Sequence, residues 1–122
     1  MTPAETVDAF IHAIEARDVE SAMALLSEDC VYDNVPMQPV VGRRAVADAL
    51  GPMILSCQEV DWVVHRQVAQ GDLVMNERLD RFSIGGRWVE VPVCGVWQVV
   101  DGSIRLWRDY FDLATFRSQM EG

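Results

Sequence analysis

The chain has 122 residues, with 19 acidic and 10 basic side chains and a formal net charge of −9. All of the basic residues are arginines, which excludes a lysine Schiff base, a P-loop lysine and a lysine-rich nucleic-acid surface. The acidic balance also disfavours nucleic acid and membrane surfaces as partners, because phosphate groups and anionic lipids repel it. Half of the residues are hydrophobic, which is typical of a globular chain, and the length predicts one domain over residues 1–122.

Helical signals dominate the first part of the chain. Residues 2–5 combine a capping threonine, a first-turn proline and a glutamate three positions on, which predicts a helix start. Apolar side chains at helical spacing over residues 7–14 predict that one face of this helix packs inward. A second, short helix is predicted after Asp18. A third is predicted over residues 43–50, and we expect Gly51-Pro52 to end it.

Extended segments and turns fill the rest of the chain. Residues 29–35 are predicted to be extended, and Pro36 and Pro39 to form a loop that ends at Gly42. Helices followed by strands predict an α+β fold, with N-terminal helices in the concavity of a curved, mainly antiparallel sheet, a cone of the cystatin type. The second half predicts four antiparallel strands and a closing helical turn, at residues 59–70, 73–84, 88–100, 104–112 and 113–120.

The cysteines, the histidines and the N-terminus give no sign of a metal site or a leader. Cys30, Cys57 and Cys94 are far apart and odd in number, which predicts reduced, buried thiols in a cytoplasmic protein. His12 and His65 have no partner at ligand spacing, so we expect no metal. Neither a signal peptide nor a membrane span is expected, because the chain enters an amphipathic helical pattern at once and lacks a long apolar run.

Several charged and polar residues fall on strand faces that we expect to point inward. Strand alternation places Asn76, Arg78, Asp80 and Phe82 on one side, and Met75, Glu77, Leu79 and Arg81 on the other. In the last strand, Arg105, Trp107, Asp109 and Phe111 share a face, and the aromatic neighbours of Asp109 predict that this face is interior. Tyr32 and Asn34 are also two positions apart. The residues that could converge are therefore Tyr32, Asn34, Arg78, Asp80 and Asp109.

Each part of this set also has a structural interpretation. Arg78 and Asp80 could form a surface ion pair, Tyr32 and Asn34 could belong to a turn, and Asp109 could form a salt bridge. Buried together, however, an arginine and two aspartates that share one proton make a neutral cluster. Such a cluster holds a carboxylic acid beside a carboxylate, which suits the addition of water to an epoxide without a covalent intermediate.

Large apolar side chains could form the wall of a pocket beside these groups. The sequence does not separate pocket wall from core for such residues. Glu77, Arg81 and Arg108 lie on the opposite faces and are interpreted as outer-face or dimer-interface charges. The candidate substrate contacts are Phe82, Trp107, Phe111, Phe116 and Met53.

Three segments resemble the limonene-1,2-epoxide hydrolase family in order and spacing: residues 32–34 (Tyr-Asp-Asn), 76–80 (Asn-Glu-Arg-Leu-Asp) and 106–112 (Leu-Trp-Arg-Asp-Tyr-Phe-Asp). The resemblance implies a domain of the nuclear-transport-factor-like α+β cone superfamily, commonly a homodimer, that needs no cofactor. It further implies that Asp80 is the general acid, that Asp109 activates a water held by Tyr32 and Asn34, and that Arg78 bridges the two aspartates. The implied substrate is a small apolar epoxide of cyclic or terpene type, and the product is a vicinal diol.

Two other functions fit the same fold. A ketosteroid-isomerase-like or polyketide-cyclase-like proton shuttle needs one carboxylate base and a donor to an enolate, with no evident use for an arginine between two aspartates. A non-catalytic module that binds small molecules would not need both Asp80 and Asp109. Arg78 is therefore the residue that discriminates between these functions.

Overall fold

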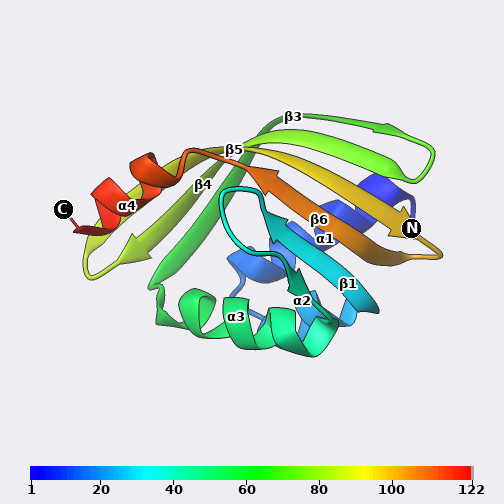
Figure 1. Cartoon of the computed structure of the whole chain (residues 1–122), viewed down its shortest axis with the longest axis horizontal. Helices are drawn as coiled ribbons and strands as arrows, with labels where there is room; N and C mark the ends of the chain where they lie inside the picture. Colours follow the sequence, from blue (N-terminus) through cyan, green and yellow to red (C-terminus); the bar gives the residue numbers. More distant parts are fainter. Residues whose placement is uncertain (122) are drawn as a thin grey trace.

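The structure is a computed structural model, and it describes residues 1–121. Four helices and six strands make up this part of the chain, and the predicted order of helices first and long strands later is confirmed (Figure 1). The predicted bounds of the strands over residues 59–70 and 73–84 are confirmed to the residue. The elements are α1 (Pro3–Glu15), α2 (Val19–Ala24), β1 (Leu26–Asn34), β2 (Val40–Val41), α3 (Arg43–Ser56), β3 (Glu59–Gln70), β4 (Leu73–Ile84), β5 (Arg87–Val100), β6 (Ser103–Tyr110) and α4 (Leu113–Glu121).

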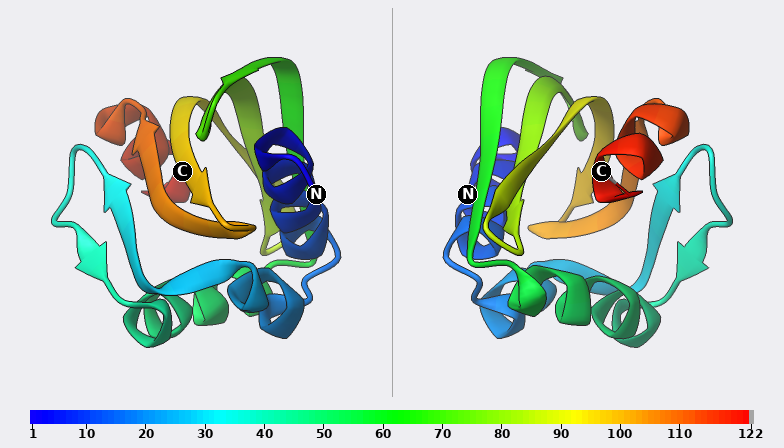
Figure 2. Two further views of the ribbon diagram at one scale, coloured as in Figure 1. Left: turned by 90° about the vertical axis from the view of Figure 1, so that its right-hand side faces the viewer. Right: turned by 90° about the vertical axis from the view of Figure 1, so that its left-hand side faces the viewer.

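The six strands form one curved sheet in the order β2-β1-β6-β5-β4-β3. Every neighbouring pair is antiparallel except β1 and β6, which run parallel. The sheet arches over α1, and α2 and α3 lie beneath β1 at the open side of the arch (Figures 1 and 2). The expected α+β cone is confirmed. The antiparallel meander was predicted from the sequence. The parallel pairing of β1 was not, because it requires a partner distant in the chain.

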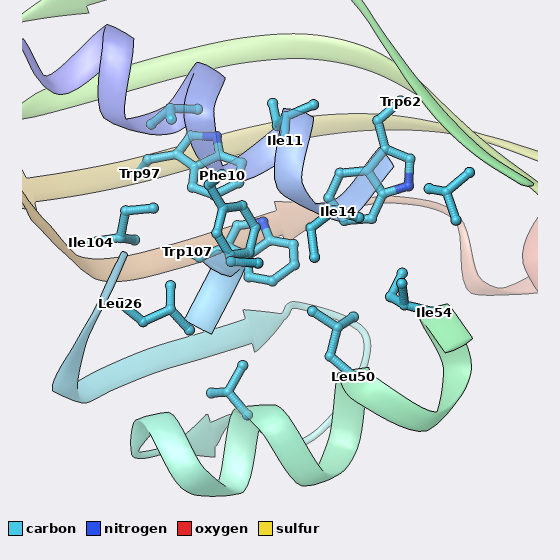
Figure 3. Close-up of a cluster of buried hydrophobic side chains, with 14 of the residues drawn as sticks. Phe10, Ile11, Ile14, Leu26, Leu50, Ile54, Trp62, Trp97, Ile104 and Trp107 are labelled. Carbon is cyan, nitrogen blue, oxygen red and sulfur yellow. The ribbon is translucent and has the colours of Figure 1, made fainter. Parts of the chain in front are cut away.

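The core lies between α1 and the concave face of the sheet. The predicted capping box at Thr2 and Glu5 starts α1, and the predicted apolar face of this helix is buried. The Phe10 ring meets Trp97 and Trp107 edge-on, with centroid distances of 5.6 and 5.0 Å, while the two indoles stack 5.2 Å apart (Figure 3). Large aromatic rings in such contacts contribute more than their buried area alone, so this group anchors the cone.

The prediction that α3 ends at Gly51-Pro52 is wrong, because the helix continues to Ser56. Leu50 and Ile54 are buried one turn apart, so the apolar stripe continues beyond the proline. Pro52 cannot donate to the carbonyl of Asp48, but both residues are exposed, and water can satisfy that oxygen. Packing of the buried stripe therefore outweighs the local cost of the proline.

Three further expectations need correction. Arg105 is exposed, because the β5–β6 register shifts between Gln98 and Val99 and a bulge turns the arginine outward. Val40 and Val41 form β2 within the expected proline loop and pair with β1. Cys94 is exposed, whereas the predicted burial of the other two cysteines is confirmed, and burial raises the pKa of both thiols. All three cysteines are free. Within residues 1–121, no helix has the length and apolar character needed to cross a membrane.

Candidate active site

A cavity of about 210 Å³ is lined by residues of the sheet, of α3 and of α4. Four of the five candidate catalytic residues line it: Tyr32, Asn34, Asp80 and Asp109. The fifth, Arg78, is 1% exposed and does not reach the cavity surface. The strand alternation that predicted an inward face for Asn76, Arg78, Asp80 and Phe82 is confirmed, since all four are buried.

The guanidinium of Arg78 connects the two aspartates. Its Nε donates to Asp80 Oδ1 at 2.9 Å and its Nη2 donates to Asp80 Oδ2 at 3.0 Å, a bidentate pair. The same Nη2 donates to Asp109 Oδ2 at 2.9 Å. With exposed fractions of 5% for Asp80 and 4% for Asp109, this is a buried cluster, not a surface ion pair. The surface interpretation of Arg78 and Asp80 is therefore excluded.

Burial makes a doubly ionised cluster unfavourable. Burial raises the pKa of Asp109 to about 6, helped by the charge of Asp80 and opposed by Arg78. Burial also raises the pKa of Asp80, again opposed by Arg78. Burial opposes the charge of Arg78, but the two aspartates outweigh it and keep the pKa of Arg78 above its ordinary value. The arginine therefore stays charged, and below a pH of about 6 the two carboxyls hold at least one proton between them.

Tyr32 and Asn34 stand beside this pair on β1. The parallel β1–β6 pairing sets Asn34 opposite Asp109 and Tyr32 opposite Trp107. Asn34 Nδ2 donates to Tyr32 Oη at 2.9 Å, so the tyrosine hydroxyl can donate its own hydrogen into the cavity. Burial, together with the charge of Asp109, raises the pKa of Tyr32, and the phenol stays neutral. These two side chains can hold a small polar molecule next to a carboxylate.

The walls of the cavity are largely apolar. Four of the predicted substrate contacts line it: Phe82, Phe111, Phe116 and Met53. Trp107 does not line it, which corrects that expectation. Its ring is fully buried and stacks at 4.0 Å against Tyr32, so it supports the tyrosine from the core side. The remaining lining residues were not predicted from the sequence: Met37, Gln38, Val40, Ala49, Leu50, Trp62, Val91 and Val93.

Trp62 is one of the missed residues that strand alternation could have predicted. It pairs in register with Asp80 on the neighbouring strand and shares its face. Strand alternation over residues 59–70 combined with an antiparallel partner would have placed it there. Val91 and Val93 alternate on β5 and were open to the same reasoning, whereas the other missed residues depend on the placement of α3 and of the segment around β2, which local patterns do not encode. Among residues 1–121, no three His, Cys, Asp or Glu side chains are grouped in a way that could hold a metal ion.

These features define a class of protein: a small α+β cone with a buried Asp-Arg-Asp cluster at one end of an apolar cavity. The chain belongs to the limonene-1,2-epoxide hydrolase family, whose catalytic-domain model matches residues 1–121. It is 40% identical over 107 residues to epoxide hydrolase EphG of Mycobacterium tuberculosis, covering 88% of this chain and 71% of that protein.

Two solved structures illustrate the fold relationship. One is a limonene-epoxide-hydrolase-like epoxide hydrolase of M. tuberculosis, with a TM-score of 0.83 and 37% identity over 95% of this chain and 86% of that one. The other is an NTF2-like protein of unknown function from Cytophaga hutchinsonii, with a TM-score of 0.75 and 22% identity over 92% of this chain and 91% of that one. The second likeness extends only to the fold, which hosts many functions.

Proposed function

We propose that this protein is a cofactor-independent epoxide hydrolase that adds water to a cyclic or terpene-type epoxide and releases a vicinal diol. The observation that carries the proposal is the buried guanidinium of Arg78 between Asp80 and Asp109, at the polar end of an otherwise apolar cavity. Family membership and the relative named an epoxide hydrolase support the same reaction.

In the proposed mechanism one water attacks an epoxide carbon while the ring opens. Tyr32 and Asn34 hold the water, and Asp109 takes its proton as the new carbon–oxygen bond forms. Asp80 gives a proton to the epoxide oxygen as the carbon–oxygen bond of the ring breaks. The two proton transfers balance in one step, so neither carboxylate forms an ester. The position of Asn34 opposite Asp109 supports the assignment of the water to Asp109.

The hydrogen bonds of the free site favour one position for the shared proton, and this bears on how the site returns to its starting state after each turnover. Both oxygens of Asp80 accept from Arg78, whereas Asp109 accepts only one of these bonds, at Oδ2. The shared proton therefore resides preferentially on Asp109 in the free protein, which is also its place after one turnover. We propose that it returns to Asp80 before the next water is activated, and that Arg78 keeps the two carboxyls close enough for this transfer.

The cavity supports a small apolar substrate. Aromatic and aliphatic side chains from β4, β5, α3 and α4 surround the polar end, and a cavity of about 210 Å³ suits a molecule of modest size. An apolar ring can fill these walls by the hydrophobic effect while its epoxide oxygen faces Asp80. Charged epoxides are disfavoured, because the walls offer little to replace their hydration.

We also infer a homodimer in solution. The convex face of the sheet carries exposed apolar side chains, among them Val68, Met75 and Tyr110. Met75 alternates with the inward Asn76, and Tyr110 alternates with the inward Asp109, so both point away from the cavity. Analytical ultracentrifugation tests this inference directly: a single species of dimer mass supports it, and a monomer at micromolar concentration contradicts it.

The reaction itself is tested by turnover of a panel of cyclic and terpene epoxides, with chiral separation of the diols. We expect at least one of them to give a diol at a rate well above its uncatalysed hydrolysis. The Asp80→Asn protein serves as the matched control for contaminating activity. Absence of turnover on the whole panel would contradict the proposal and favour an isomerase or a binding module.

A further inference from the structure

A buried amide contacts Arg78 on an edge that neither aspartate uses. Asn76 is 3% exposed and does not line the cavity. Its Oδ1 accepts from Arg78 Nη1 at 2.8 Å and from Trp97 Nε1 at 3.2 Å. Both partners can only donate, so the amide must present its oxygen to them. Three groups therefore hold the guanidinium: Asp80, Asp109 and Asn76.

The orientation of the Asn76 amide is fixed from its other end as well. Its Nδ2 donates to Gln67 Oε1 at 3.0 Å, and Gln67 Nε2 donates to Asp8 Oδ1 on α1, also at 3.0 Å. This series of hydrogen bonds begins at Arg78, which can only donate, and ends at the carboxylate of Asp8, which can only accept. Reversing either amide would set donor against donor or acceptor against acceptor, so the hydrogen bonds support one arrangement.

Gly95 supplies the space that this arrangement needs. It lies in the middle of β5, paired in register with Asn76 on one side and Asp109 on the other. A Cβ atom at this position would overlap Arg78 Nη1 and would lie 2.8 Å from Asn76 Oδ1 and 2.9 Å from Asp109 Oδ1. Each of these distances is shorter than a van der Waals contact permits.

The backbone of Gly95 does not itself require glycine. Its φ angle is outside the left-handed region, in contrast to the turn glycines Gly71, Gly85 and Gly102. A glycine inside a strand is less favourable than an alanine, because it loses more conformational freedom on folding. The close approach of the Arg78 guanidinium explains why the strand has no side chain at this point.

We propose that Asn76 and Gly95 are positioning residues that together seat the guanidinium of Arg78, so that its Nη2 reaches both aspartates at once. Neither residue lines the cavity, so both act through Arg78. The inference rests on the proposed function for its kinetic consequences. The seat, by which we mean the position of the Arg78 guanidinium set by Asn76 and Gly95, is a property of the free protein and is measurable without substrate.

The first test is the Asn76→Ala protein, which removes the acceptor and leaves a buried N–H of Arg78 unpaired. We expect kcat to fall about 10- to 100-fold with KM nearly unchanged, because a misplacement of 1 Å can cost 100-fold and the cavity wall is intact. Normal kcat, or a loss confined to KM, would overturn the proposal for Asn76.

The Asn76→Asp protein distinguishes positioning from mere structural support. It keeps an oxygen for Arg78 but adds a carboxylate to a network whose charged groups are Arg78, Asp80, Asp109 and Asp8. The added charge strengthens proton binding by the aspartate pair, so we expect its titration to shift upward by about one pH unit or more. Carboxyl carbon NMR measures this shift in the free protein, and an unchanged titration in the folded variant contradicts the proposal.

Gly95→Ala is the second variant, and Gly51→Ala is its matched control. A Cβ at Gly51 in α3 would meet only Val19 Cγ1, at 3.6 Å, which is an ordinary contact. We expect Gly95→Ala to lose at least 10-fold in kcat and to change the Arg78 guanidinium NMR signals, and Gly51→Ala to alter neither. Unchanged Arg78 signals in Gly95→Ala would overturn the inference. Altered signals in a protein that turns over no epoxide would uphold the seat and reject the proposed function.

Discussion

Asn34 lies directly opposite Asp109 in the parallel β1–β6 pair, and the N–H of the next residue, Val35, donates to the carbonyl of Asp109 at 3.0 Å. This pairing joins two segments that are far apart in the sequence. It sets the amide and phenol of β1 beside the carboxylate of β6. Strand β4, which is separated from β6 by β5, supplies Arg78 and Asp80 from the other side. The candidate site therefore exists only because the sheet combines one parallel pair with an antiparallel meander.

Replacement of Tyr32 by phenylalanine tests whether β1 holds the attacking water. The ring should keep its place against Trp107, since the stacking needs no hydroxyl. We expect kcat to fall about 10- to 100-fold, because one of the groups that orient the water is lost. Steady-state kinetics with the preferred epoxide measure the change. The exposed Tyr110 provides the control, and a loss of the same size in Tyr110→Phe would contradict the assignment.

Replacement of either aspartate by asparagine should abolish diol formation while the fold remains. Each variant removes one end of the proton transfer, and we expect a loss of about 1,000-fold or more, since acid and base catalysis each contribute about 100- to 10,000-fold. Circular dichroism verifies the fold. Asp48→Asn, on the exposed side of α3, is the control that should retain activity. Near-normal turnover by Asp80→Asn or Asp109→Asn contradicts the mechanism.

The raised pKa of Asp109 predicts a pH-dependent stability difference. Its pKa rises from an ordinary 3.8 to about 6 in the folded protein, so between these values the folded state binds more protons than the unfolded one. Wild-type stability from this group is therefore present at low pH and is lost as pH rises through about 6. Asp109→Asn lacks this dependence.

We accordingly expect the free energy of unfolding of Asp109→Asn, relative to wild type, to increase by about 1–3 kcal/mol between pH 4.5 and 7.5. Urea denaturation at the two pH values provides the measurement. A difference that is constant with pH, or that decreases as pH rises, shows that Asp109 does not hold its proton as described.

The apolar walls predict how substrate size responds to mutation. Phe116 of α4 contacts Phe111 edge-on at 6.4 Å, and both rings line the cavity. Phe116→Ala enlarges the cavity at that end, so we expect a severalfold higher KM for a small cyclic epoxide and faster turnover of a bulkier one. Competition between two epoxides of different size measures this change. An unaltered preference would place the substrate elsewhere.

Local alternation was sufficient to predict one side of the site. The inward positions of Arg78 and Asp80 follow from the period of two along β4, which needs no knowledge of the partner strand. The same rule failed at Arg105, because a bulge formed with β5 breaks the alternation and is a property of the strand pair. Sequence also left Trp107 unassigned between core and cavity, since both environments select large aromatic rings.

Other features required the tertiary structure. The continuation of α3 through Pro52 depends on the buried contacts of Ile54, which outweigh a local helix-breaking signal. The parallel partner of β1 could not be chosen from local pattern. Without that partner, the sequence does not predict that Asn34 lies opposite Asp109. The role of Gly95 was not predicted for a related reason. A side chain is excluded there by the guanidinium of Arg78, which lies on the neighbouring strand β4.

In the proposed mechanism water attacks the epoxide directly, with Asp109 as base and no covalent ester. A single-turnover reaction in ¹⁸O-labelled water, with enzyme in excess over epoxide, tests this mechanism. Mass spectrometry of the diol and of the protein locates the label. The proposed mechanism predicts one ¹⁸O atom in every diol molecule from the first turnover and none in the protein. Unlabelled diol in the first turnover, with label in a carboxylate of Asp80 or Asp109, would contradict it.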